Sequence, residues 1–344
     1  MYNKFQRWKH KNNLFLVTCC TLLFLSALTS TIHAQILRRY SFERGLMGTQ
    51  FKLIFYAPDS VKAKQAVQAV YARMDTLNQI MSDYLDGSEI NRLSETAGSG
   101  RWVKVSPALF DVLSKALWIA ENSGGRFDPT IGPLSQLWRR AVRRHLFPSK
   151  AELQKARRAV GYRLVQVDSA TRSVRLTRSG MKLDLGGIGQ GFAIDEALKV
   201  FHFFGIRSAL IDLGGDILVG DAPPNQPGWR IDVGSGKAND ADTLTLILTN
   251  TAITTSGDTY RYLEHNGRRY SHIMDPRSGL GLRHFVRATV LAPDGWRADA
   301  LTKVFSVAGW RKSRHLLQRF PQTELYLLEN KSGRLRSWKS AAFK

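Results

Sequence analysis

The segment that decides the fold is residues 184–195, which read DLGGIGQGFAID. Its four glycines follow a β-like segment at residues 181–183 and precede a helical run. Glycine leaves backbone amides unhindered and a helix N-terminus attracts anions, so this turn suits a phosphate or pyrophosphate group. A tight turn without a ligand also explains these residues. The pattern argues against a nicotinamide dehydrogenase, because Phe192 stands where a Rossmann fingerprint has its third glycine.

Upstream of this segment, the chain before residue 160 predicts mainly helices. β-Branched and aromatic residues first predict a strand over residues 50–56. Apolar residues then recur every three or four positions between residues 61 and 82, which predicts one long helix. Ser88 and Ser106 stand at N-cap positions, before helices that we expect to end at residues 93 and 121.

Beyond residue 160, short β segments alternate with glycine-rich turns. We expect strands over residues 164–167, 173–176, 209–218, 229–233, 243–248 and 287–291, helices over 191–204 and 298–307, and a hairpin of 324–328 with 334–338. No fixed-period repeat or low-complexity linker divides the chain. Residues 35–344 are therefore predicted to form one compact α+β unit with a mixed or antiparallel sheet and flanking helices, and a division into two lobes is left open.

The composition is that of a folded protein. Of 344 residues, 43% are hydrophobic and 23% are charged, which excludes a disordered, collagen-like or multi-span membrane protein. The two cysteines, Cys19 and Cys20, are adjacent. They cannot form a disulfide framework or a four-ligand zinc site.

Residues 1–34 have the pattern of a secretory signal peptide. Four basic residues between positions 4 and 11 precede an apolar run at 14–27, which is shorter than the roughly 20 residues that span a bilayer. We expect cleavage near Ala34 and an exported, periplasmic protein, with association with the inner membrane left open. Lipidation at Cys19 is an alternative, but only the five residues at 14–18 would form its hydrophobic core.

Positive charge dominates the chain. Fifty Lys and Arg against 28 Asp and Glu give a net charge of +22, or +18 without residues 1–34. This balance favours anionic ligands or surfaces, but nucleic acid is not expected for an exported protein whose basic residues are mostly scattered. The one dense cluster is Arg139, Arg140, Arg143 and Arg144. Its spacing predicts a single helical face, either solvated or directed at an anionic membrane surface.

A loop at residues 124–134 is the second candidate for a functional segment. It reads GGRFDPTIGPL, with turn-forming residues around a few apolar ones. Ligand-binding loops have this make-up because proline and glycine fix the backbone around a few polar groups. A rigid connector in which Asp128 makes a turn hydrogen bond is the alternative.

The third candidate combines residues 254–258 with residues 272–279. His272 lies three residues before Asp275 and could supply a general base. The Ser/Thr/Gly run at 254–258 could donate hydrogen bonds to a phosphate. A single histidine is also common as a packing or surface residue.

The fourth candidate lies at residues 299–303. On a helix that begins near Ala298, Asp299 and Thr302 share a face and offer a carboxylate and a hydroxyl to a hard cation. Oxygen ligands of this kind favour Mg²⁺ when phosphates and water complete its shell. An acidic residue that complements the helix dipole is the alternative explanation.

Together these segments resemble the FAD:protein FMN transferase family, the ApbE-like flavin transferases. The matching motifs, in chain order, are residues 47–49, 82–84 with 88–90, 127–130, 184–195, 214–216, 256–258, 272–279 and 298–300. They extend over nearly the whole chain after residue 34. Each motif is loose by itself, but eight in the same order are specific.

The resemblance implies a Mg²⁺-dependent transfer of FMN from FAD to a Thr or Ser hydroxyl of an acceptor protein, with release of AMP. Acceptors would be flavin-bearing subunits of sodium- or proton-linked membrane electron-transfer complexes, or other exported flavoproteins. Hydrolysis of FAD to FMN and AMP, and noncatalytic FAD binding with a degenerate metal site, remain open as alternatives.

The resemblance also implies the site residues. FAD contacts would come from Met47, Tyr84, Arg126, Phe127, Asp128, Asp184, Gln190 and Ile273. Mg²⁺ would be held by the Gly187 carbonyl, the Asp299 carboxylate and Thr302. His272 or Asp275 is the candidate base.

Two residues depart from the family pattern. Many relatives carry Lys or Glu where Gln190 stands, and many carry a metal-ligating Thr where Lys303 stands. An ammonium about 4 Å from a divalent ion is repelled by roughly 8 kcal/mol at an effective dielectric constant near 20. Either Lys303 turns its charge toward a phosphate or solvent while Thr302 serves the ion, or metal binding is weakened. We expect the first.

Overall fold

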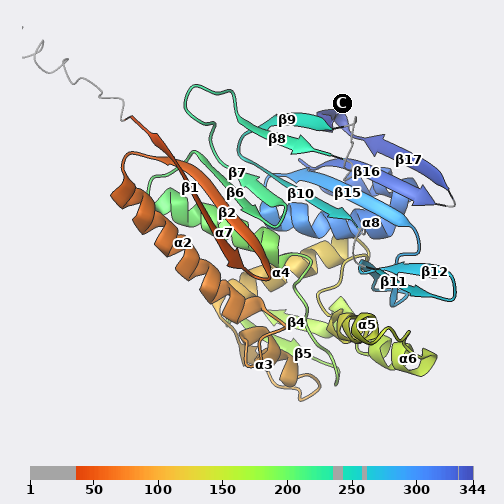
Figure 1. Cartoon of the computed structure of the whole chain (residues 1–344). Coiled ribbons are helices and arrows are strands. Elements are labelled where there is room, and N and C mark those ends of the chain that lie inside the picture. Colours follow the sequence, from red (N-terminus) through yellow and green to blue (C-terminus); the bar gives the residue numbers. More distant parts are fainter. Residues whose placement is uncertain (1–35, 235–242, 258–261, 332, 344) are drawn as a thin grey trace, which may run out of the picture. The chain divides into compact units, whose positions relative to one another are not determined.

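An eight-stranded antiparallel sheet organises the residues that the computed structural model describes, 36–234, 243–257, 262–331 and 333–343 (Figure 1). In order across the sheet, its strands are β1 (Arg38–Leu46), β2 (Thr49–Ala57), β6 (Ala209–Leu213), β7 (Asp216–Val219), β10 (Thr251–Gly257), β15 (Phe285–Ala292), β16 (Glu324–Lys331) and β17 (Arg334–Lys339). Residues 37–344 form one unit, which agrees with a single α+β fold. The predicted signal peptide and Cys19 lie outside the described residues and stay predictions.

Three helices cover one face of this sheet: α2 (Ser60–Met81), α7 (Gly189–Phe203) and α8 (Gly295–Leu317). The alternating side chains Phe51, Leu53 and Phe55 of β2 are fully buried in the core beneath them. On the opposite face, a smaller core includes Trp229 and Ile231 of the pair β8 (Trp229–Val233) and β9 (Leu244–Leu248). The large sheet is therefore covered by apolar side chains on both faces.

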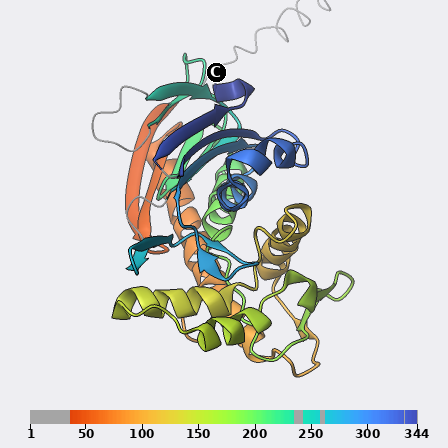
Figure 2. The same cartoon turned by 90° about the vertical axis from the view of Figure 1, so that its right-hand side faces the viewer.

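Most of the remaining elements lie below the large sheet and its helices in the view of Figure 2. They are α3 (Glu89–Glu95), α4 (Pro107–Asn122), α5 (Gly132–Arg144), α6 (Lys150–Arg158), the small sheet of β3 (Val103–Lys104), β5 (Ser173–Leu176) and β4 (Val165–Asp168), and the pairs β11 (Tyr262–His265) with β12 (Arg268–Ser271) and β13 (Met274–Asp275) with β14 (Leu280–Gly281). Short 3₁₀ helices lie at Tyr162–Leu164 and Ala341–Phe343. No helix in the described ranges is long and apolar enough to cross a membrane.

Most predicted elements are confirmed, with three corrections. The predicted strand over 209–218 is two strands, β6 and β7, because Gly214 and Gly215 adopt positive φ angles of 67° and 96° and turn the chain. Helix α6, strand β1 and the short strands β3, β11, β12, β13 and β14 were not predicted. Residues 254–257, considered above only as phosphate donors, lie in the central strand β10.

Candidate active site

The glycine-rich turn and the loop at 124–134 lie against each other. The Asp184 amide donates to the Pro129 carbonyl oxygen over 2.8 Å. A Cβ on Gly132 would lie 2.6 Å from the Lys182 carbonyl oxygen, so only glycine allows this close approach. The first two candidate segments therefore form one wall.

The N-terminal ends of α7 and α8 meet at two glycines. A Cβ on Gly191 would lie 2.1 Å from the Gly295 carbonyl oxygen, and the Gly191 amide donates to Asp299 Oδ2 over 3.1 Å. Asp195 of α7 accepts hydrogen bonds from the amides of Gly295 (2.7 Å) and Trp296 (2.9 Å) and so caps α8. Burial raises the pKa of Asp195 to about 7. This contact joins the first and fourth candidate segments.

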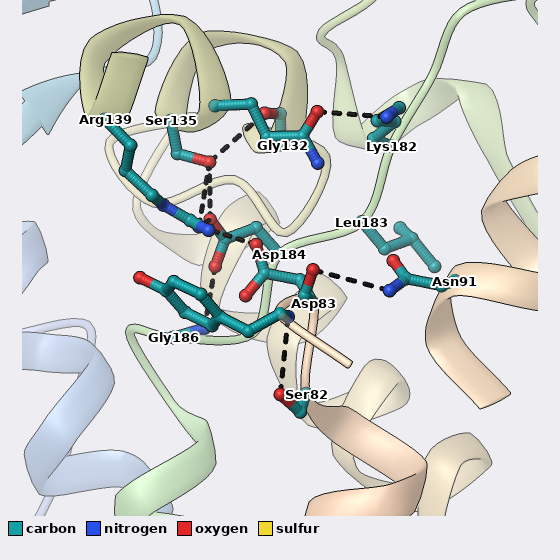
Figure 3. Close-up of polar contacts among 12 residues, drawn as sticks. Ser82, Asp83, Asn91, Gly132, Ser135, Arg139, Lys182, Leu183, Asp184 and Gly186 are labelled. Carbon is teal, nitrogen blue, oxygen red and sulfur yellow. Dashed lines mark hydrogen bonds and ion pairs between the residues drawn. The ribbon is translucent and has the colours of Figure 1, made fainter. Parts of the chain in front are cut away.

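A cluster of polar side chains braces the start of the turn (Figure 3). Asp184 Oδ2 accepts hydrogen bonds from Ser135 Oγ (2.5 Å) and from an Arg139 Nη (2.7 Å), and Asp184 Oδ1 accepts one from the Gly186 amide (2.8 Å). The same Arg139 nitrogen lies 2.6 Å from Asp83 Oδ2. Burial and the charge of Asp184 raise the pKa of Asp83, against the opposing effect of Arg139.

Asp83 and Arg139 are site residues that sequence reasoning missed. Arg139 does not share a solvated face with its neighbours: its guanidinium lies 4.3 Å from the centroid of the Tyr84 ring and bonds two buried acids, whereas Arg140, Arg143 and Arg144 are exposed. The predicted single arginine face is therefore wrong. A usable signal was the i, i+4 spacing of Ser135 and Arg139, which places both on the side of α5 that contacts Asp184.

A second charged cluster lies on the other side of the turn. Lys303 Nζ is ion-paired with Asp299 Oδ1. A Cβ on Gly187 would lie 3.6 Å from Lys303 Cγ and 3.2 Å from the Phe127 ring, so both side chains border the turn. Burial, reinforced by the charge of Asp299, raises the pKa of Asp216 to about 8, although Lys303 opposes the rise. Burial alone would lower the pKa of Lys303, but Asp299 and Asp216 raise it.

Two of the three predicted Mg²⁺ donors, Asp299 and Thr302, are engaged within the protein and do not suit a divalent ion. Both oxygens of Asp299 are engaged, one by Lys303 and one by the Gly191 amide. The Thr302 hydroxyl donates back to the Asp299 carbonyl oxygen over 2.7 Å. Within the described ranges, no three His, Cys, Asp or Glu side chains form a group that could hold a metal ion. The charge of Lys303 is directed at Asp299, which differs from our expectation of a phosphate or solvent, and the Mg²⁺ site stays a prediction.

The loop at residues 272–279 packs on α5. Trp138 Nε1 donates to the Gly279 carbonyl oxygen over 3.0 Å, and a Cβ on Gly279 would lie 3.1 Å from Leu134 Cδ2. Arg157 of α6 donates to the Arg277 carbonyl oxygen over 2.9 Å. These contacts place the third candidate segment beside the second.

Within this loop the two candidate bases have different surroundings. Asp275 forms a bidentate ion pair with Arg277, at 2.8 Å to Nε and 2.7 Å to Nη2. His272 is exposed, and the adjacent Ile273 is buried. Burial and the charge of Arg277 lower the pKa of Arg126, whereas the charge of Asp275 raises it. Arg126 therefore lies within electrostatic range of the Asp275–Arg277 pair.

A model of the ApbE family matches residues 47–327. This chain belongs to the ApbE family. It is 30% identical to a FAD:protein FMN transferase of Treponema pallidum, with 86% of each chain covered, and 26% identical to one of Salmonella typhimurium, with 92% of this chain and 90% of the relative covered. Among solved structures, the flavin transferase ApbE from Vibrio cholerae has a similar fold, with a TM-score of 0.80 at 23% identity over 90% of this chain and 99% of that chain. The ApbE protein from Thermotoga maritima gives a TM-score of 0.76 at 27% identity, over 89% and 98%.

In this ApbE-family chain, several predicted FAD-contact residues surround the turn. Phe127 and Asp184 border it directly, and Gln190 lies partly buried in the first turn of α7. Asp128 differs, because both of its carboxylate oxygens already accept hydrogen bonds. Oδ1 accepts from the Thr130 amide (2.8 Å) and hydroxyl (2.6 Å), and Oδ2 accepts from the Tyr162 amide (2.9 Å). Its geometry favours the alternative given above, a carboxylate that braces its own loop.

The other predicted FAD-contact residues differ in their local surroundings. Met47 occupies the turn between β1 and β2 with a φ of 49°, and a Cβ on Gly214 would lie 2.5 Å from the neighbouring Thr49 Oγ1. Arg126 Nε is buried and lacks a hydrogen-bond partner among the residues described. Tyr84 is 75% exposed. Asp258 of the third segment lies outside the described residues, and the individual roles stay predictions.

Proposed function

We propose that this chain is a FAD:protein FMN transferase. The observation that carries the proposal is the glycine turn at residues 186–191, where the N-terminal ends of α7 and α8 meet between two charged clusters. Backbone amides at helix N-termini bind phosphate oxygens, and FAD contains a diphosphate. The curated relatives in Treponema pallidum and Salmonella typhimurium carry this name and match along nearly their whole length, which supports the same reaction here.

In the proposed reaction, an acceptor Thr or Ser hydroxyl oxygen attacks the phosphorus on the FMN side of the diphosphate. A phosphoester bond forms to the acceptor, and the bond from that phosphorus to the bridging oxygen breaks. The bridging oxygen leaves with AMP, and the hydroxyl proton goes to a base. No oxidant or reductant is needed.

The proposed roles follow from the surroundings of each side chain. His272 is the proposed base, because imidazole titrates near neutral pH. Asp275 is proposed to position Arg277, to which it is already bound twice, rather than to take the proton. Arg126, with its buried Nε, is proposed to donate to FAD. Since the predicted Mg²⁺ donors do not fit the ion, no step of this proposal uses a metal.

The experiment mixes the purified protein with FAD and a candidate acceptor protein. Flavin fluorescence that stays on the denatured acceptor supports transfer, free FMN with AMP supports hydrolysis, and unchanged bound FAD supports a binding role. His272→Asn should lower the transfer rate by about 10²–10⁴-fold, the usual contribution of a general base. His145→Asn is the matched control, because His145 is exposed at the end of α5 with a φ of 53°, which Asn tolerates. Equal rates for both variants would remove His272 from the reaction.

The acceptor proteins and the cellular location of the chain are also proposed here. We propose that the acceptors are exported flavoproteins, including subunits of membrane electron-transfer complexes, and that the chain works in the periplasm beside an anionic membrane surface. The signal-like residues 1–34 support export. The exposed arginines at the end of α5 and the basic helix α6 support the membrane surface.

A further inference from the structure

Lys303 brings a positive charge to the place where metal ligands were predicted. It lies one helical turn after Asp299 on α8, and the two side chains form an ion pair. The Asp299 side chain is 1% exposed and the Lys303 side chain 26%, so Lys303 is the more accessible residue of the pair. A ligand would therefore meet the cation before it met the acid.

The stem of Lys303 runs along the glycine turn. A Cβ on Gly187 would lie 3.6 Å from Lys303 Cγ and 3.7 Å from its Cε, both ordinary contact distances. The aliphatic stem of Lys303 therefore packs against the turn at van der Waals distance. The ammonium lies beside the amides to which the diphosphate of FAD is proposed to bind.

Two buried acids lie near Lys303, and Asp299 is the one that is ion-paired with it. Asp216 is 6% exposed at the start of β7, and its electrostatic neighbours include Asp299 and Lys303. Buried carboxylates need a paired cation, which can be a metal ion or a side chain. In this chain the cation is a side chain, tethered to the same helix as one of the acids.

We infer that Lys303 takes the place of a divalent metal ion, so that the FMN transfer of this chain proceeds without Mg²⁺. The inference rests on the proposed function. An ammonium has three N–H donors, one of which bonds Asp299, and lysine binds phosphate oxygens as a point charge. A Lys–Asp pair is neutral overall, whereas a Mg²⁺–Asp pair keeps one positive charge. The remaining charge that stabilises the diphosphate comes from Arg126 and Arg277, which lie near each other at the adjacent loops.

The test measures FMN transfer by the wild-type chain in excess EDTA and in added Mg²⁺, together with binding of Mn²⁺, detected by its electron paramagnetic resonance signal. The wild type should transfer FMN at the same rate in both conditions and should not bind Mn²⁺. Lys303→Thr should bind Mn²⁺ at least about 100-fold more tightly, because the substitution removes the repulsion between the lysine ammonium and the divalent ion. Near a protein surface this repulsion is roughly four times stronger than in water. Its transfer should then depend on added metal.

Two further variants separate charge from packing. Lys303→Met should lose transfer in EDTA, whereas Lys303→Arg, which keeps the charge, should retain part of it. Lys115→Met is the matched control, because Lys115 forms the same i, i+4 pair with Asp111 and has a similar side-chain exposure of 25%. It should change neither metal dependence nor Mn²⁺ binding. Circular dichroism melting curves check that each variant is folded.

The outcomes separate this inference from the proposed function. Mn²⁺ binding by the wild type, or transfer that stops in EDTA and returns with Mg²⁺, overturns the inference and leaves the transferase intact. If FMN transfer is absent in every condition, the proposed function fails, and the Mn²⁺ measurement on the wild type and Lys303→Thr still decides whether Lys303 excludes a metal.

Discussion

Arg139 holds two buried carboxylates with one guanidinium. The side chains of Asp83 and Asp184 are 6% and 9% exposed, and that of Arg139 is 30% exposed. Breaking a buried ion pair by removal of one partner leaves an uncompensated charge, which typically costs about 3–5 kcal/mol. Partial exposure of Arg139 reduces this cost through solvent screening.

Arg139→Met should lower the free energy of unfolding by about 2 kcal/mol, a value discounted from the fully buried case for that exposure. Urea unfolding at pH 7 measures the loss. Arg140→Met, on the exposed side of the same helix, is the control and should stay within about 0.5 kcal/mol of the wild type. Asp83→Asn in the Arg139→Met background should recover part of the loss. Equal losses for the two arginine variants would contradict the proposed pairing.

At the same scale, the sequence identified the glycine turn but not the arginine that braces it. Residues 186–191 carry a local signal, because four closely spaced glycines before a helix leave backbone amides unhindered at the helix N-terminus. Arg139 and Asp184 are 45 positions apart, and the arginine stands among three exposed ones. Helical spacing predicts which residues share a face, but not which acid that face meets.

At the scale of elements, local signals explain both the successes and the failures. Helix α4 begins where predicted, because Ser106 Oγ accepts from the Leu109 amide over 3.2 Å. Strand β1 was missed because most of its side chains are exposed, so it lacks the alternation that marks a half-buried strand. Its position depends on pairing with β2, a contact between elements.

The cap of α8 by Asp195 should make stability depend on pH. The folded carboxyl keeps its proton up to about pH 7, whereas an unfolded aspartate loses its proton near 3.8. Between these values the folded state holds more protons, so the free energy of unfolding should fall as pH rises from about 4 to 7, by at most about 1.4 kcal/mol per pH unit, and then level off.

Urea unfolding of the wild type and Asp195→Asn at pH 5, 6, 7 and 8 measures this contribution. Asn cannot titrate, so the variant should show a shallower fall than the wild type between pH 5 and 7. Asn also keeps an oxygen that can accept one of the two amide bonds from Gly295 and Trp296. Parallel curves would show that Asp195 does not titrate in this range.

At the scale of the whole described molecule, the large sheet combines strands from both ends of the chain. Strand β2 pairs with β6, and β10 lies between β7 and β15. Sequence patterns predicted the α+β class and most strands, but the strand order depends on long-range pairing that periodicity does not encode. The family resemblance supplied the site residues that stay predictions.

The sequence determines the total net charge, but the fold determines where the charged side chains lie on the surface. The C-terminal end of α5 and the helix α6 present Arg140, Arg143, Arg144, Lys150, Lys155 and Arg158 as exposed basic residues. Nearby Leu146 is 65% exposed and Val142 43% exposed, so apolar side chains accompany the charge. Together they form a basic surface with apolar side chains that suits an anionic bilayer.

The chain without residues 1–34 should therefore bind vesicles that contain phosphatidylglycerol, and binding should weaken as salt rises. Changing Arg140, Arg143 and Arg144 to Gln should lower the partition coefficient by at least about tenfold, because each basic residue near the surface contributes to the attraction. Changing the exposed Arg311, Lys312 and Arg334 to Gln removes the same net charge elsewhere and is the matched control. Co-sedimentation with vesicles of stated composition measures both. If the two triple variants weaken binding equally, net charge alone governs the interaction and the surface formed by α5 and α6 has no special role.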